Sequence, residues 1–136
     1  MTIKEMKIGD SASMTKTVTE GEVYLYAGIS GDQNPAHVNE VEASQGMFKS
    51  RIAHGMFTAG YVSAVLGMKL PGPGTIYLGQ ELKFKKPVRF QDTITATCTV
   101  SEILEEKNIV KLTTVCTNQN GEVVLDGVAT VMPPKA

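Results

Sequence analysis

One segment near the middle of the chain is apolar on every side of a helical wheel. Residues 55–70, GMFTAGYVSAVLGMKL, contain one charged side chain, Lys69, and the residues that follow, 71–74, are PGPG. A helix without a polar face has to be covered on every face, and proline and glycine end it. The segment therefore predicts a buried helix that the rest of the chain must cover.

The second half of the chain alternates apolar and polar side chains, as antiparallel strands with one wet face do. Four such segments follow one another, at residues 77–87, 93–100, 109–117 and 122–132. EEKN at 105–108 and the pair Asn120-Gly121 provide turns between neighbouring segments. The pattern predicts four consecutive strands.

The first part of the chain predicts a strand and then helix. Residues 12–18 alternate weakly, and Thr19 with Glu22 forms a capping-box pattern before apolar side chains at helical spacing. This helix is expected to end near Ser30, and residues 40–48 are expected to hold a second, short helix. The order is therefore strand, helix, buried helix and four strands.

A twisted antiparallel sheet with one apolar face can cover a wholly apolar helix by curling round it. This predicts an α+β chain with a five-stranded antiparallel sheet wrapped around a buried central helix, the arrangement called a hot-dog fold. Residues 1–136 have the length of a single domain. A general α+β sandwich is the alternative.

Composition excludes several classes of partner. Thirteen basic and fourteen acidic residues give a net charge of −1 without a run of one sign, so no nucleic-acid partner is expected. The N-terminal residues mix charges and no apolar stretch has the length of a membrane span, which indicates a cytoplasmic protein. Cys98 and Cys116 lie in separate strand patterns and are interpreted as buried free thiols rather than a disulfide or a metal site.

Residues 30–39, SGDQNPAHVN, gather chemically active side chains in one short segment. Neither a helix nor a strand would bring Asp32 and His37 together at this spacing, but Asn34-Pro35 bends the chain away from helix. A carboxylate and an imidazole that meet can perform general acid–base chemistry, and the Asn34 amide can orient them. The alternative is an ordinary turn with a surface histidine.

His54 and Gly55 stand at the start of the predicted buried helix. Amides at a helix N-terminus have no internal acceptor and can hold a developing oxyanion, and glycine leaves room for a carbonyl. His54 can instead cap the helix or satisfy a hydrogen bond in the core. With the acid–base pair, these groups can add water across a double bond conjugated to a carbonyl.

Three segments of the chain resemble one known family. SGDQNPAHVN is similar to the Asp-x-Asn-Pro-x-His hydratase 2 motif of the MaoC-like (R)-specific enoyl-CoA hydratases, and no motif position departs from it. Residues 51–67 and 70–96 are similar to the segments that follow in that family, at similar spacing. The resemblance covers nearly the whole chain and suits the short members with a single hot-dog domain.

The resemblance implies reversible syn hydration of a trans-2-enoyl-CoA to the (3R)-3-hydroxyacyl-CoA. Asp32 and His37 would be the catalytic pair, Asn34 would support their loop, and the Gly55 amide would bind the thioester oxygen. Separately from the resemblance, His54 is counted among the supporting residues because it stands next to Gly55. Asp32 is favoured as the base toward water and His37 as the proton donor, although one water handled by both remains open. Coenzyme A would enter as part of the substrate, and neither a metal nor another cofactor is expected.

Helical spacing from Gly55 suggests where the acyl chain would run. Positions one and two turns further on the same side are Ala59, Val62, Ser63 and Leu66. Packing of these side chains against the sheet alone is the alternative. Basic side chains on one later strand pattern are interpreted as a solvated face rather than as contacts to CoA phosphates, namely Lys83, Lys85, Lys86 and Arg89.

The resemblance also implies an acyl-CoA thioester as partner and a homodimer or a dimer of dimers. Other functions stay open at this point. A dehydratase would act on acyl-carrier-protein thioesters, a hot-dog thioesterase would release free thiol, and a binding module would leave acyl-CoA unchanged.

Overall fold

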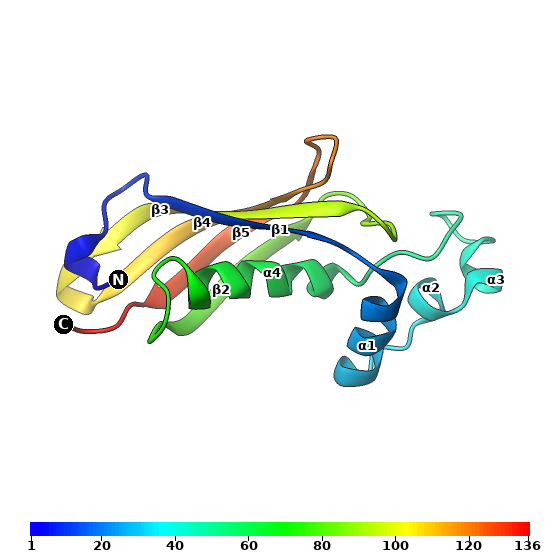
Figure 1. Cartoon of the computed structure of the whole chain (residues 1–136), viewed down its shortest axis with the longest axis horizontal. Coiled ribbons are helices and arrows are strands. Elements are labelled where there is room, and N and C mark those ends of the chain that lie inside the picture. Colours follow the sequence, from blue (N-terminus) through cyan, green and yellow to red (C-terminus); the bar gives the residue numbers. More distant parts are fainter.

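A single five-stranded antiparallel sheet packs on one long helix (Figure 1). The computed structural model describes residues 1–136. Its strands lie in the order β1-β3-β4-β5-β2, and their bounds are β1 Ser11–Thr17, β2 Ile76–Phe84, β3 Thr93–Leu104, β4 Ile109–Thr117 and β5 Val123–Met132. The predicted order of elements and the hot-dog arrangement are confirmed.

The helices divide into one central helix and a cluster beyond its N-terminal end. In Figure 1, α4 (Gly55–Met68) runs along one face of the sheet, and α1 (Glu20–Ser30), α2 (Pro35–Val38) and α3 (Glu40–Ala43) lie past the start of α4. Two short 3₁₀ helices complete the chain, η1 (Ile3–Glu5) and η2 (Glu105–Lys107). None of these helices has the length and hydropathy that crossing a membrane requires.

The core lies between α4 and the sheet. Val62, Val65 and Leu66 of α4 are buried there, and the alternate side chains of β3 in the same core are Ile94, Ala96, Cys98 and Val100. Burying one Val, Leu or Ile side chain contributes roughly 1.5–3 kcal/mol. The period-2 pattern therefore assigned the buried face of this strand correctly.

The prediction that α4 is buried on every face is wrong for the single chain. Gly60 and Gly67 are exposed, as is Ser63, and Met56 and Met68 expose 54% and 74% of their surface. The sheet covers only one side of the helix, and the residues on the other side are mainly small or flexible. This outer side is therefore available to a ligand or a second chain.

Arg51 connects the helices at the N-terminal end of α4. Its guanidinium donates to Glu20 of α1 at 2.9 Å and to Glu40 of α3 at 2.8 Å, and it lies 4.9 Å from the centre of the Phe90 ring. The hydrogen bond from Arg51 lowers the pKa of the Glu20 carboxyl. These contacts tie together the two helices that flank the segment carrying Asp32.

Both cysteines are buried and free, as the sequence predicted. Burial raises the pKa of Cys98 to about 12 and that of Cys116 to about 11. Since the thiolate is the reactive form, neither thiol is a candidate nucleophile.

Candidate active site

The segment between α1 and α3 contains a short helix that the sequence pattern did not predict. Asn34 caps α2, because its Oδ1 accepts the Ala36 N–H at 2.9 Å. Pro35 occupies the first helical position, where its missing N–H costs nothing and its fixed φ suits the helix. The prediction that Pro35 turns the chain away from helix is therefore wrong, and His37 lies on α2.

The ring of His37 has a defined orientation. Its Nδ1 lies 2.7 Å from the Ile52 carbonyl oxygen, and a carbonyl can only accept, so Nδ1 carries a proton. The side chain is almost buried, with 9% of the residue exposed. Nε2 is thus the nitrogen that remains to exchange a proton with a ligand.

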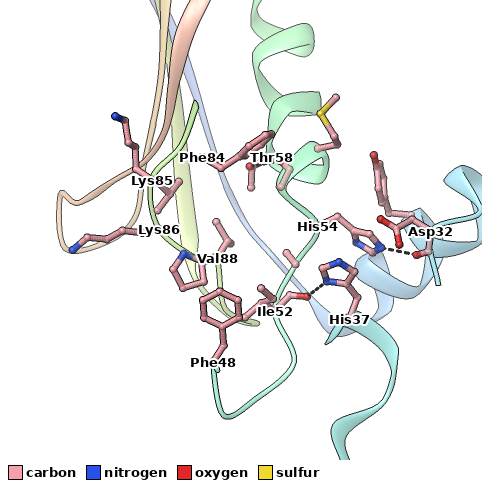
Figure 2. A pocket seen from close by; sticks show the side chains of 16 residues that line it. Asp32, His37, Phe48, Ile52, His54, Thr58, Phe84, Lys85, Lys86 and Val88 are labelled. Carbon is pink, nitrogen blue, oxygen red and sulfur yellow. Dashed lines mark hydrogen bonds between the residues drawn. The ribbon is translucent and has the colours of Figure 1, made fainter. Parts of the chain in front are cut away.

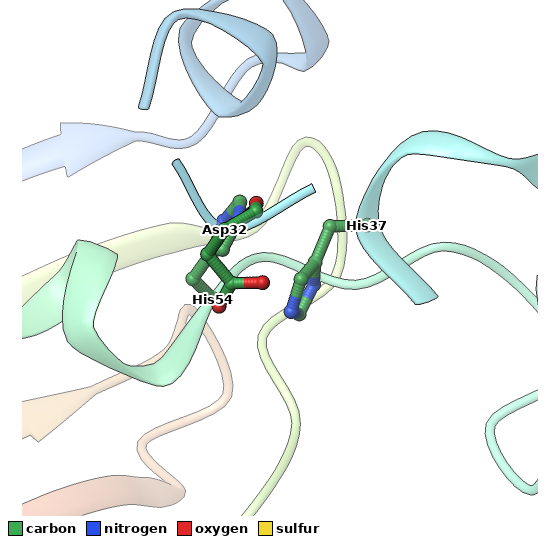
Figure 3. A group of neighbouring side chains, drawn as sticks. All are labelled: Asp32, His37 and His54. Atoms are coloured by element: carbon green, nitrogen blue, oxygen red, sulfur yellow. The ribbon is translucent and has the colours of Figure 1, made fainter. Parts of the chain in front are cut away.

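Asp32 and His37 meet, as the spacing argument proposed (Figure 3). The ligand atoms of Asp32, His37 and His54 all lie within 4.8 Å of one another. One Asp32 oxygen, Oδ1, accepts the Asn34 N–H at 3.2 Å. One water that makes two hydrogen bonds of about 2.8 Å can bridge such a gap, so the pair can hold a single water.

His54 directly precedes α4, but its side chain is buried against the His37 ring and does not cap the helix. It exposes 2% of its surface, its Nε2 donates to the Asp32 carbonyl at 2.8 Å, and its ring stacks on His37 with centroids 3.8 Å apart. The Tyr26 ring packs against it as well, with centroids 4.7 Å apart. Of the two structural roles considered for His54, a cap or a core hydrogen bond, the second is correct, because its side chain makes no cap bond.

The same three residues form the only group of at least three potential metal ligands in the chain. The His37 and His54 rings are stacked with an angle of 28° between their planes. Because the nitrogen lone pairs lie in the ring planes, those of the two stacked rings do not converge on one ion. His54 Nε2 is also occupied by the Asp32 carbonyl. The donor geometry therefore suits proton transfer better than metal coordination.

Gly55 is the first residue of α4, so its N–H has no acceptor within the helix. A Cβ atom at this position would lie 2.7 Å from Cε1 of Phe84. The ring of Phe84 therefore lies directly against Gly55, and no larger residue fits while the ring stays in place. Thr58, one turn later, donates to the Gly55 carbonyl at 3.0 Å.

A cavity of about 470 Å³ joins these groups (Figure 2). Asp32, His37, His54 and Gly55 all line it. Lys85 and Lys86, interpreted from the sequence as part of a solvated face, also line the cavity, and so do four residues that were not predicted for the site, Tyr26, Phe48, Thr58 and Phe84. Spacing along α4 could have found Thr58. The others come from distant segments, and nothing local in the sequence places them at the site.

The four residues predicted for the acyl chain separate into two pairs. Ala59 and Ser63 line a second cavity, whereas Val62 and Leu66 expose 0% and 1% of their surface in the core. The prediction that the acyl chain runs along all four residues is therefore wrong for Val62 and Leu66, for which the alternative of packing against the sheet is correct. Only Ala59 and Ser63 offer open surface.

The buried imidazole of His54 predicts a pH effect on stability. Burial lowers the pKa of His54 below its usual 6.5, so below pH 6.5 the unfolded chain binds a proton that the folded chain does not bind. The stability that the neutral His54 side chain contributes to the folded chain is complete above pH 6.5, and it is lost as the pH falls through the lowered pKa of His54 in the folded chain. Urea denaturation of the wild type and of His54→Phe from pH 7.5 to 5 should show that the free energy of unfolding falls more steeply with falling pH in the wild type. Equal slopes would contradict this.

Comparisons with known proteins agree on one family. A protein-family model described as "MaoC like domain" matches residues 5–122 of this chain. An (R)-specific enoyl-CoA hydratase from Rhodospirillum rubrum is 56% identical over 96% of this chain and 90% of its own length. A solved structure of R-hydratase PhaJ1 from Pseudomonas aeruginosa is 41% identical, with a TM-score of 0.94 over 99% of this chain and 86% of its own.

A second solved structure agrees over nearly the whole length of both proteins. The (R)-hydratase from A. caviae that is involved in PHA biosynthesis is 39% identical, with a TM-score of 0.93 over 96% of this chain and 99% of its own. The fold, the match to the family model and the sequence identity over nearly the full length all indicate the same family. The chain belongs to the MaoC-like domain family.

Proposed function

We propose that the chain is an (R)-specific enoyl-CoA hydratase, a hydro-lyase that adds water reversibly to a trans-2-enoyl-CoA and yields the (3R)-3-hydroxyacyl-CoA. The single observation that carries this proposal is the meeting of Asp32 and His37 in one cavity with Gly55. Relatives named as hydratases support it. Residues 1–136 act as one MaoC-like unit, and coenzyme A takes part only as the carrier of the acyl group.

The proposed reaction uses three groups. Asp32 removes a proton from the bound water while the water oxygen attacks the β-carbon, and the enolate oxygen is stabilised by the Gly55 N–H. His37, protonated at Nε2, donates a proton to the α-carbon. Return of the Asp32 proton to His37 restores the enzyme, so that one water is consumed for each product.

The proposal is tested with crotonyl-CoA. Loss of the enoyl absorbance reports hydration, and resistance of the product to an (S)-specific 3-hydroxyacyl-CoA dehydrogenase reports the (3R) configuration. Unchanged absorbance would contradict the proposal and leave a binding module. Product that the dehydrogenase oxidises would contradict the stereochemistry.

Two other enzymes on this fold are separated by the same assay. A thioesterase would release thiol, which a thiol reagent detects, and Cys98 and Cys116 add little background while the chain is folded because both are buried. A dehydratase for carrier-protein thioesters would prefer crotonyl-carrier protein to crotonyl-CoA. The hydratase is expected to prefer the CoA thioester and to release no thiol.

Gly55→Ala is expected to lower kcat about 10²-fold and leave the fold intact. The added methyl group meets the Phe84 ring, which must shift, and a small displacement beside the oxyanion is costly to the rate. The double variant Gly55→Ala/Phe84→Leu gives the methyl more room and should recover part of kcat. Full activity of Gly55→Ala would contradict the oxyanion role.

We also propose that the acyl chain runs past Ala59 and Ser63, which line the second cavity.

We further propose that two copies of the chain associate through β2. This strand lies at one edge of the sheet, where Ile76, Tyr77 and Leu78 expose 55%, 40% and 48% of their surface. Unpaired edges with apolar side chains favour pairing with another chain. Light scattering after gel filtration should give twice the mass of the chain, or four times for a dimer of dimers. A single-chain mass would contradict the association.

A further inference from the structure

A second cavity adjoins the catalytic cavity on the outer side of α4. It has a volume of about 530 Å³, and Ala59 and Ser63 of α4 and Tyr77, Gln80 and Leu82 of β2 contribute to its walls. The side of α4 that the sheet leaves uncovered is therefore not flat but bounds a hollow against the edge strand.

Only Met56 and Phe84 line both cavities. Each of them exposes 54% of its surface, so neither is locked in the core. Met56 is unbranched and adapts readily to its surroundings, and Phe84 stands at the end of an edge strand. These two side chains form the partition between the cavities, named here the 56/84 partition.

Phe84 also lies next to the position that a thioester would take. Its ring lies against Gly55, where an added Cβ would be 2.7 and 2.8 Å from two ring atoms. A carbonyl bound to the Gly55 N–H therefore has the ring beside it. An acyl chain that extends beyond the reacting double bond must end before the partition or pass it.

The second cavity suits an alkyl chain. Its two larger polar side chains are paired, because the Tyr77 hydroxyl donates to Gln80 Oε1 and Gln80 Nε2 donates to Thr114 Oγ1 at 2.9 Å. Burial raises the pKa of Tyr77 to about 12, so the hydroxyl is neutral. A wall whose polar groups are already paired accepts apolar groups without leaving those polar atoms unsatisfied.

We propose that the 56/84 partition determines which acyl chain lengths the enzyme accepts. A four-carbon chain stays within the catalytic cavity, whereas a longer chain enters the second cavity and displaces Met56 and Phe84. The proposal rests on the hydratase function and assigns Phe84 as a residue that sets chain-length specificity.

The test compares kcat/KM for trans-2-octenoyl-CoA and crotonyl-CoA as a ratio within each variant. Any damage to the oxyanion contact affects both substrates and cancels in the ratio. Phe84→Leu should raise the ratio about tenfold or more, since each methylene in an apolar pocket changes discrimination by about that factor. Met56→Ala should raise it in the same direction, and Ser63→Phe, which fills the second cavity, should lower it.

Phe48→Leu is the matched control, because Phe48 lines the catalytic cavity but not the second one. Its ratio should equal that of the wild type. An unchanged ratio in both Phe84→Leu and Ser63→Phe overturns the partition while the hydratase function stands. A loss of dimer mass in Ser63→Phe with an unchanged ratio assigns the second cavity to a second copy and also overturns it. A wild type that leaves crotonyl-CoA unchanged overturns both proposals.

Discussion

Asp32→Asn and His37→Asn are each expected to lower kcat/KM for crotonyl-CoA by about 10²- to 10⁴-fold, the usual contribution of a general acid or base. An amide in place of the Asp32 carboxylate cannot take a proton from water. An amide in place of the His37 imidazole cannot deliver one to carbon. Because the two residues would share one water, the double variant should be little slower than either single variant.

Both substitutions are chosen so that the local structure survives. Asp32→Asn retains a side-chain oxygen for the Asn34 N–H that Asp32 Oδ1 now accepts. His37→Asn retains a side-chain N–H that can donate to the Ile52 carbonyl in place of Nδ1. Asp126→Asn, on β5 and outside the catalytic cavity, is the matched control and should keep full activity. Turnover near that of the wild type in either site variant would refute the assignment of the pair.

Gly127→Ala is expected to destabilise the fold by about 3 kcal/mol, at the upper end of the range for overpacking, and to lower Tm by about 10 °C. Gly127 lies on β5 opposite Leu82 of β2. A Cβ atom there would overlap the Glu81 carbonyl oxygen and lie 2.7 Å from its carbon. These are backbone atoms, so the strands themselves would have to move apart.

Gly79→Ala provides a control on the same pair of strands. Gly79 has open space around its position for a Cβ atom, so its stability should change by no more than about 0.5 kcal/mol. Thermal and urea unfolding should be followed at one fixed protein concentration, because association of chains also shifts the midpoint. Equal stability of Gly127→Ala and Gly79→Ala would show that β2 and β5 approach less closely than the structure indicates.

The strands were predictable because each one carries its own pattern. Residues 109–117 form β4 with the bounds that the alternation indicated. Thr19 caps α1 and accepts the Glu22 N–H as the capping pattern predicted. The short helix α2 was missed because its four residues contain no period, and because Pro35 can either break a helix or begin one.

The candidate site was predictable only in part. The motif indicated Asp32 and His37, and the start of an apolar helix indicated Gly55, since both features are local. His54 beneath the pair, the Ile52 carbonyl that orients His37 and the Phe84 ring against Gly55 depend on contacts between distant segments. No local pattern carries that information.

By itself, the sequence determined the order of the elements, the buried face of the strands and the residues able to transfer protons. These follow from side-chain periodicity and chemistry along the chain. Only the tertiary structure decided which side of α4 stays open and which nitrogen of His37 is held by the Ile52 carbonyl, leaving the other to exchange a proton. It also decided which side chains separate the two cavities. The physical reason is that a sheet covers one side of a helix, and which side it covers depends on how all five strands pair.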